Sequence, residues 1–288
     1  MRSTILGVAL TVAALVVAGC GGSGDGAVGA GGGAMLGDAS TVATRCTEAR
    51  PEDLRVEVVR TIERESDSYT QGLVVVDGRL FESGGRYGES TLRELDLDTG
   101  EELRRVDLDP DLFAEGLGVA PDGSLVQLTW KEGTALVWDP DTFELVREMS
   151  YDGEGWGLTA LGDGTLIMSD GSDSLVERDP DDFSAGLEMK VRRVGGDADR
   201  LNELDFDGES VWANRYQSDE LLRIDPNCWT VDGVLDLSAL RRQADAVDDD
   251  PDERFDVTNG VAHIPGTDRY LVTGKWWPVI YEVRFVPT

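Results

Sequence analysis

The stretch EGLGVAPDGSLVQLT, residues 115–129, is one copy of an element that decides the fold. A polar residue and a Gly-Leu pair open an apolar strand, a Pro-Asp-Gly turn follows, and a second apolar strand ends the element. This is the pattern of a β-hairpin. Related stretches begin at Gln71, Trp156, Asn202 and Asn259, at intervals of 41 to 57 residues. Such regular recurrence predicts a repeat architecture.

A second hairpin follows each of the first four copies, and its turn is rich in Asp with Pro or Gly. These hairpins are LRELDLDTGEELRRVDL (92–108), ALVWDPDTFELVREM (135–149), LVERDPDDFSAGLEM (175–189) and LLRIDPNCWTVDGVL (221–235). Two hairpins make four strands, and this period is typical of a propeller blade. The sequence therefore predicts an all-β fold, a five-bladed β-propeller. In the longest interval, LSALRRQADAVDDDPDERF (237–255) is expected to form a short helix and an acidic loop.

The fifth copy lacks an outer strand, because only VIYEVRFV (279–286) follows its first hairpin. The stretch LRVEVVRTIE (54–63) can supply that strand, which closes the ring and removes its open edge. Cys46 lies just before this stretch, and Cys228 lies in the outer turn of the neighbouring fourth blade. We therefore expect a Cys46–Cys228 disulfide, since a pair of cysteines in an exported protein favours one.

The N-terminal segment has the features of an export signal. In residues 1–20, MRSTILGVALTVAALVVAGC, the positive Arg2 precedes an apolar run that is too short to span a bilayer. The closing VAGC resembles the lipobox of bacterial lipoproteins, in which the cysteine, here Cys20, is lipidated. Residues 21–45 are rich in Gly and Ala and predict a flexible tether. We expect a propeller of residues 46–288 on the outer face of the bacterial cell membrane, held by lipid alone. The alternative is an ordinary secretory signal with a coincidental cysteine.

The charge and the single histidine exclude several functions. The chain has 57 Asp and Glu against 26 Lys and Arg, so its field opposes binding to nucleic acid. His263 is the only histidine, which excludes a zinc enzyme built on several imidazoles, and no G-x-S-x-G motif accompanies it. We expect a structural or surface role for His263, no metal or cofactor, and a monomer.

Propeller geometry predicts where the candidate site lies. The innermost strands of all blades start at one mouth of the central channel, which brings equivalent positions together. The positions at these starts and at the neighbouring strand ends are Gln71, Glu115, Trp156, Asn202, Asn259, Tyr69, Phe113, Trp130, Tyr216 and Lys275. They predict an aromatic pocket with amide groups, one ammonium and one acid whose pKa is raised by desolvation. The alternatives are that the aromatic residues pack between blades, the Asn residues form turns and Glu115 is a surface turn acid.

A set of ordered motifs carries a resemblance to a known family. The motifs are YTQGL (69–73), FAEGL (113–117), QLTW (127–130), GEGWGLT (153–159), MSDGS (168–172), LNELD (201–205), ANRY (213–216), TNGVA (258–262) and TGKWWP (273–278). Together they make the chain similar to glutaminyl-peptide cyclotransferases of the plant and bacterial type. The resemblance implies a five-bladed propeller that converts the N-terminal glutamine of peptides or proteins to pyroglutamate and releases ammonia without a metal.

The resemblance also assigns roles to residues. It implies Glu115 as the essential acid, with Asn202 and Lys275 in the catalytic set and Gln71 as a further polar contact. It implies aromatic walls at Phe113, Trp130 and Trp156, and substrate contacts also at Tyr69, Tyr216 and Asn259. Tyr69 stands where Phe is usual, Tyr216 where Trp is frequent, and FAEG replaces FGEG, from which we expect a changed substrate preference. The competing hypothesis is a non-catalytic, lipid-anchored propeller that binds peptides or small ligands.

Overall fold

The computed structural model describes residue 46 and residues 50–64, 68–247 and 257–288. Strands form nearly all of the regular structure, and the short helix α2 (Ser238–Asp245) lies in the long interval where a helix was predicted. The predicted signal peptide, the tether and most of the acidic loop lie outside the described residues. Within the described ranges, no helix has the length and apolar character needed to cross a bilayer.

Three sheets have four antiparallel strands each, in chain order. The first contains β2 (Thr70–Val76), β3 (Arg79–Gly84), β4 (Thr91–Leu95) and β5 (Glu102–Asp107). The second contains β6 (Ala114–Val119), β7 (Leu125–Thr129), β8 (Thr134–Trp138) and β9 (Leu145–Ser150). The third contains β10 (Leu158–Ala160), β11 (Leu166–Ser169), β12 (Ser174–Arg178) and β13 (Ala185–Lys190). Each sheet therefore corresponds to one pair of the hairpins that the sequence predicts.

The remaining strands form one larger, ten-stranded sheet. Its strands are β16 (Leu201–Phe206), β17 (Val211–Arg215), β18 (Glu220–Asp225), β19 (Thr230–Asp236), β1 (Glu52–Glu63), β22 (Val279–Pro287), β21 (Tyr270–Gly274) and β20 (Thr258–His263), with the short β14 (Arg192–Arg193) and β15 (Gly196–Asp197) beside β19. The expected antiparallel pairing of the N-terminal strand β1 with the last strand β22 is present. The parallel pairing of β1 with β19 was not predicted, and it joins two groups of four strands into one sheet.

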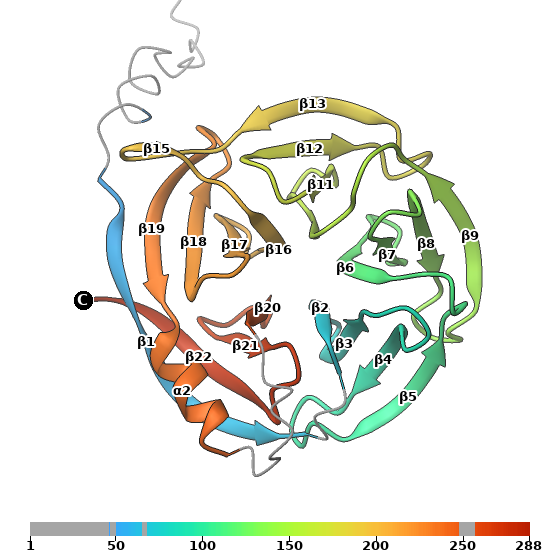
Figure 1. The fold of residues 1–288 in the computed structure, drawn as a ribbon, viewed down its shortest axis with the longest axis horizontal. Helices are drawn as coiled ribbons and strands as arrows, with labels where there is room; N and C mark the ends of the chain where they lie inside the picture. Colours follow the sequence, from blue (N-terminus) through green and yellow to red (C-terminus); the bar gives the residue numbers. More distant parts are fainter. Residues whose placement is uncertain (1–45, 47–49, 65–67, 248–256) are drawn as a thin grey trace, which may run out of the picture.

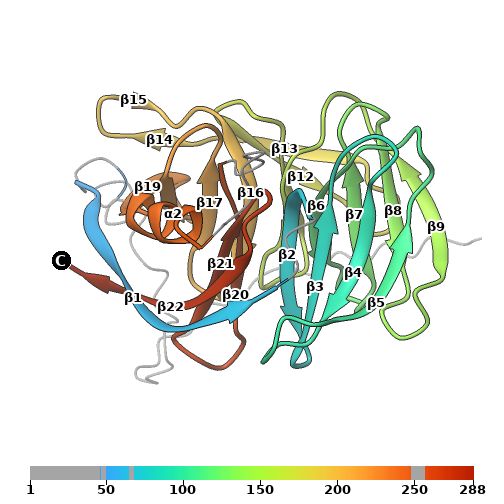
Figure 2. The same ribbon diagram turned by 60° about the horizontal axis from the view of Figure 1, so that its bottom comes forward.

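The sheets stand around a central axis, which makes the fold a β-propeller (Figure 1). Seen from the side, β2 to β5 lie next to one another as a twisted sheet that runs outward from the axis (Figure 2). The innermost strands contact each other in a closed circle, in the order β2, β6, β10, β16, β20 and back to β2. The apolar core lies in layers between neighbouring sheets; one such layer packs Val126 and Leu128 of β7 against Leu158 and Met168 of the next sheet.

Glycines let the innermost strands touch backbone to backbone. A Cβ atom added to Gly116 would lie 2.5 Å from the carbonyl oxygen of Trp156, and one added to Gly157 would lie 2.1 Å from the carbonyl oxygen of Asn202. Both distances are too short for any side chain. The Gly that follows the polar residue in the repeat is therefore required by the close approach of adjacent sheets.

Glu203 replaces this glycine in the fourth copy, and its side chain joins three innermost strands. It starts on β16, and its two carboxylate oxygens accept the backbone N–H groups of Leu73 on β2, at 2.9 Å, and Val261 on β20, at 2.7 Å. Glu203 is 1% exposed. Burial raises the pKa of its carboxyl well above the usual range, while the two backbone N–H donors oppose that rise. Its role is to satisfy donors that would otherwise be orphaned at the axis.

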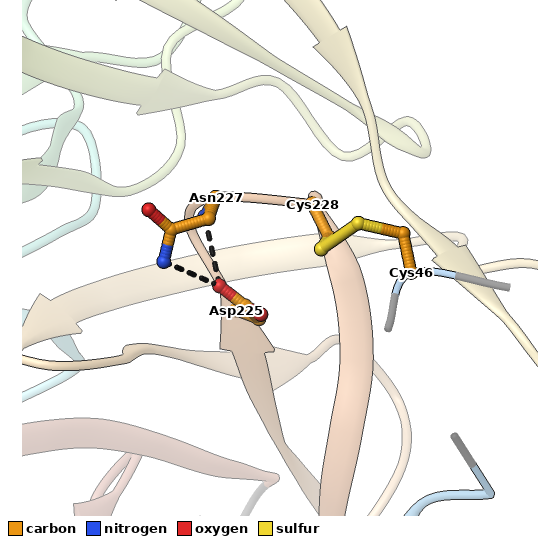
Figure 3. Close-up of a disulfide and its surroundings, with 4 residues drawn as sticks. All are labelled: Cys46, Asp225, Asn227 and Cys228. Atoms are coloured by element: carbon orange, nitrogen blue, oxygen red, sulfur yellow. Dashed lines mark hydrogen bonds between the residues drawn. A yellow bond between two sulfur atoms is a disulfide. The ribbon is translucent and has the colours of Figure 1, made fainter. Parts of the chain in front are cut away.

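A disulfide fixes the chain ahead of β1 to the outer turn of the neighbouring group of strands (Figure 3). Cys46 and Cys228 are bonded, with their Cα atoms 5.5 Å apart and a sequence separation of 182 residues. Asp225 stabilises the turn, because its carboxylate accepts the backbone N–H of Asn227 at 2.8 Å and the side-chain amide of Asn227 at 2.9 Å. The pairing expected from the sequence is present in the structure.

Replacing the carboxylate at the axis should destabilise the ring. The Glu203→Gln variant turns an amide N–H toward one of the two backbone donors, so we expect a loss of about 1–3 kcal/mol of unfolding free energy. Urea unfolding at neutral pH measures this loss. Glu209→Gln, in the exposed turn after β16, is the matched control and should unfold like the wild type. Equal stability of the two variants would contradict a structural role for Glu203.

Removing the disulfide should also lower stability. A double variant with Cys46→Ser and Cys228→Ser loses a cross-link that closes a long loop, which typically costs about 2–4 kcal/mol. Denaturant unfolding should show this loss, and adding a reductant should lower the stability of the wild type but leave the double variant unchanged. A wild type that does not respond to reductant would show that the bond does not form.

Candidate active site

A cavity of about 250 Å³ lies where the innermost strands begin. Its lining consists of Tyr69, Gln71, Phe113, Glu115, Trp130, Trp156, Asn202, Tyr216 and Lys275. These residues come from all around the ring of innermost strands. They include every residue predicted for the site except Asn259. The volume lies below the range of about 300–1,000 Å³ that is usual for drug-sized ligands, so the cavity suits a single small group.

Glu115 is the acid of this cavity, and the backbone around it is held firmly. It is the second residue of β6, where the hydroxyl of Ser83 donates to its carbonyl oxygen at 2.5 Å and the N–H of Gly116 donates to the carbonyl oxygen of Trp156 at 2.6 Å. The side chain is 5% exposed. Its Oε1 accepts a hydrogen bond from Nε2 of Gln71 at 2.9 Å. The carboxyl is therefore fixed in place and nearly removed from water.

Burial raises the pKa of the Glu115 carboxyl well above its usual range. The positive charge of Lys275 acts against this rise, and the negative charges of Glu154 and Glu132 add to it. Lys275 is itself 3% exposed, so its charge is poorly screened by solvent. A carboxyl with a raised pKa can exchange a proton with an amine under conditions closer to neutrality than a solvated glutamate can.

A chain of amide groups continues from the acid around the ring. Nδ2 of Asn202 donates to Oδ1 of Asn259 at 2.9 Å, and Nδ2 of Asn259 donates to the carbonyl oxygen of Thr70 at 3.0 Å and more weakly to Oε1 of Gln71 at 3.4 Å. Asn259 is fully buried and does not line the cavity; it lies behind Gln71 and Asn202 and orients them. Oδ1 of Asn202 is buried and accepts no hydrogen bond from any described residue.

Aromatic rings form the walls. Phe113 packs edge-on against Tyr69, with the ring centroids 6.4 Å apart, and lies 5.4 Å from Trp130. Trp156 packs edge-on against Tyr216 at 5.3 Å. The ammonium of Lys275 lies 4.5 Å from the Tyr69 ring centroid and 5.1 Å from that of Tyr216. The two tyrosines that depart from the family pattern therefore flank this ammonium.

Two further residues at the mouth had no contact assigned to them from the sequence, although the sequence placed both near the ring. Trp276 packs edge-on against Tyr69, with centroids 4.6 Å apart. Glu154 accepts hydrogen bonds from the indoles of both Trp130 and Trp156. The adjacent motifs GEGW and KWW were visible in the sequence, but the direction of a side chain in a loop is not.

Other features of the described chain do not compete with this cavity. Three wider grooves, of about 360 to 680 Å³, are lined by turns and charged side chains, with no aromatic residue in any of the three linings. No group of three or more His, Cys, Asp or Glu side chains that could hold a metal ion occurs among the described residues. His263 Nε2 pairs with the carbonyl oxygen of Thr267 at 2.8 Å and does not line the cavity.

Fold and site together define a β-propeller enzyme whose small aromatic cavity holds a buried acid at one end of the ring axis. The family model for glutamine cyclotransferase matches residues 33–285, so the chain belongs to the glutamine cyclotransferase family. It is 34% identical to the glutaminyl-peptide cyclotransferase of Arabidopsis thaliana over 231 residues, which are 80% of this chain and 71% of the relative. The crystal structure of Myxococcus xanthus glutaminyl cyclase superimposes with a TM-score of 0.76 at 35% identity and covers 83% of this chain and 100% of that chain.

Proposed function

We propose that this enzyme cyclises the N-terminal glutamine of peptides or proteins to pyroglutamate and releases ammonia. Family membership supports the activity, and the observation that carries it to this chain is the buried Glu115 within a cavity the size of one residue. The runner-up, a binding scaffold without catalysis, does not explain why a single acid with a raised pKa is kept in an apolar cavity.

In the proposed reaction, the α-amine nitrogen of the substrate attacks the carbonyl carbon of the glutamine side-chain amide. A C–N bond forms and closes a five-membered ring, and the C–N bond to the amide nitrogen breaks. Because the reaction is intramolecular, the substrate itself supplies most of the proximity, provided that the cavity holds a productive conformer. The remaining task is to move one proton from the amine to the departing nitrogen, which leaves as ammonia.

We assign that proton transfer to Glu115. As a carboxylate it accepts the proton of the substrate ammonium, and as a carboxylic acid it donates this proton to the leaving nitrogen. Gln71 supports both states, since its hydrogen bond fixes the carboxyl in one orientation. The ring nitrogen then gives its second proton to the regenerated carboxylate, from which it passes to the departing ammonia or to solvent, so the cyclisation of an ammonium substrate releases one proton besides ammonia.

Asn202 and Lys275 supply the other polar contacts in our proposal. The buried Oδ1 of Asn202 can accept an N–H of the substrate, which removes the penalty of leaving it without a donor. The ammonium of Lys275 places positive charge in a poorly solvated site, where it stabilises the oxyanion that develops on the attacked carbonyl. Tyr69 and Tyr216 flank that ammonium, so their hydroxyl-bearing rings are the positions at which we expect a changed substrate preference.

We also propose that the ring has five blades. Five innermost strands in a closed circle support this count, with the ten-stranded sheet read as two blades that β1 links. In this interpretation β1 is the outer strand of the last blade, and its parallel contact with β19 is the seam to the fourth blade.

The segment ahead of residue 46 supports a proposal for location. The apolar run after Arg2 and the closing VAGC favour export and lipidation at Cys20, and the Gly-rich residues 21–45 favour a tether. The chain would then act as a lipid-anchored monomer on the outer face of the membrane, where the Cys46–Cys228 disulfide is compatible with the redox conditions.

Replacing the proposed proton carrier should abolish turnover while the fold survives. Glu115→Gln removes the titrating group but keeps its shape, so we expect kcat for Gln-peptides to fall by about 10²–10⁴-fold, the usual contribution of general acid–base catalysis. Ammonia release and mass spectrometry of the peptide product measure the rate, and thermal unfolding checks the fold. Glu148→Gln, on the exposed outer strand β9, is the control. A rate near that of the wild type in the Glu115 variant would refute the assignment.

The pH dependence should report the same carboxyl. Below its pKa Glu115 carries a proton and cannot accept one from the substrate ammonium, so kcat/KM should rise with pH through this raised pKa. The decline at higher pH follows the substrate α-amine, whose pKa is about 7.7–8.0. Lys275 lowers the pKa of Glu115, and Lys275→Gln should therefore move the rising limb to higher pH.

Lys190→Gln, at an exposed position on β13, removes the same charge far from the cavity and is the control for this pH experiment. It should leave the rising limb where it is in the wild type. An unchanged rising limb in the Lys275 variant would mean that a group other than Glu115 controls it.

A further inference from the structure

One carboxylate oxygen at the cavity mouth binds two walls of the cavity at once. Oε2 of Glu154 accepts the indole N–H of Trp130 at 2.8 Å and the indole N–H of Trp156 at 3.1 Å. Trp130 directly follows β7 of the second sheet, and Trp156 precedes β10 of the third sheet. Glu154 therefore joins side chains from two different sheets across the seam between them.

The surroundings keep Glu154 in this position. The N–H of Gly155 donates to the carbonyl oxygen of Trp130 at 3.0 Å, which places the backbone of the loop beside the first indole. Gly155 has no room for a side chain, because an added Cβ would lie 2.3 Å from the hydroxyl of Tyr151. The ammonium of Lys131 lies 3.6 Å from the other carboxylate oxygen of Glu154 and 3.7 Å from the Trp130 ring centroid.

The two hydrogen bonds add to the order of the indoles, because each ring is only half-buried. Trp156 lies against the backbone of Gly171, where an added Cβ would be 2.6 Å from the ring, and against Tyr216. Trp130 lies against Phe113. A half-buried ring can still change its side-chain torsions, and ordering it on binding would lower affinity.

We propose that Glu154 is a positioning residue, which holds Trp130 and Trp156 as one preformed wall for the N-terminal glutamine. This inference rests on the proposed function, because the wall is given a role in binding that substrate. The ion pair with Lys131 is secondary: both side chains are about half exposed, and exposed pairs contribute little to stability. The two indole hydrogen bonds are the contacts that matter, because they fix the width of the cavity.

The steady-state test compares two substitutions. Glu154→Ala removes both hydrogen bonds, and we expect it to raise KM for a Gln-peptide about tenfold, the equivalent of one such contact, while kcat changes less than about threefold. Glu154→Gln keeps an oxygen that accepts indole N–H bonds and should restore most of the affinity. Glu148→Ala, on the exposed strand β9, removes the same charge and should behave as the wild type.

Two kinetic outcomes would overturn the proposal. The first is an unchanged KM in the Ala variant. The second is equal behaviour of the Ala and Gln variants, which would mean that Glu154 acts through its charge on Glu115 rather than through the indoles.

A spectroscopic test does not depend on turnover. The chain has seven tryptophans, so ¹⁵N labelling resolves their indole N–H signals, and Trp130→Phe and Trp156→Phe assign the two at the mouth. Both signals should shift in Glu154→Ala and largely regain their wild-type positions in Glu154→Gln. Signals that do not shift would refute the two hydrogen bonds to Glu154. If the wild type itself cyclised no Gln-peptide, the proposed function would fail, and the role of Glu154 in substrate binding would fail with it. The indole signals would still decide whether the two hydrogen bonds to Glu154 exist.

Discussion

The direct contact between innermost strands is the constraint on which the rest of the structure depends. Where Gly116 and Gly157 sit, the next strand lies so close that no side chain fits between them. The residues just before these glycines, Glu115 and Trp156, must then extend toward the end of the axis rather than between the sheets. The cavity is thus a consequence of how tightly the ring closes, and its rigidity follows from the same backbone contacts.

Two buried acids near the axis show how the environment separates a structural carboxyl from the one that we propose to be reactive. Both oxygens of Glu203 accept backbone N–H groups, so its hydrogen-bonding capacity is used to hold three strands together. Glu115 instead accepts a hydrogen bond from the side-chain amide of Gln71, another residue that lines the cavity. Burial raises both pKa values, but only the carboxyl of Glu115 lines a cavity from which a proton can come. Desolvation alone would not have distinguished them.

The fold was largely predictable because the same hairpin pattern recurs in every copy of the repeat and specifies the same strand geometry each time. The hairpin pattern predicted the strands, and the missing outer strand predicted the pairing of β1 with β22. The parallel contact of β1 with β19 was not predictable, since no residue pattern specifies which neighbour a long edge strand meets beyond its own partner. The sequence also could not distinguish Asn259 from the residues that line the cavity. Asn259 occupies an equivalent repeat position, but its side chain turns back toward Thr70, and a repeat pattern does not specify the direction of a side chain.

The contacts of Glu154 could not be predicted from the sequence. They explain what the cavity mouth adds to the ring of strands. Gln71, Glu115 and Asn202 lie within the innermost strands, whereas Trp130 and Trp156 lie just outside strands, after β7 and before β10. Loop side chains need extra contacts to be as well ordered as strand residues, and one carboxylate shared by two indoles supplies them. In the reaction that we propose, the substrate folds back on itself, and a wall of fixed width would select the bent conformer on which Glu115 acts.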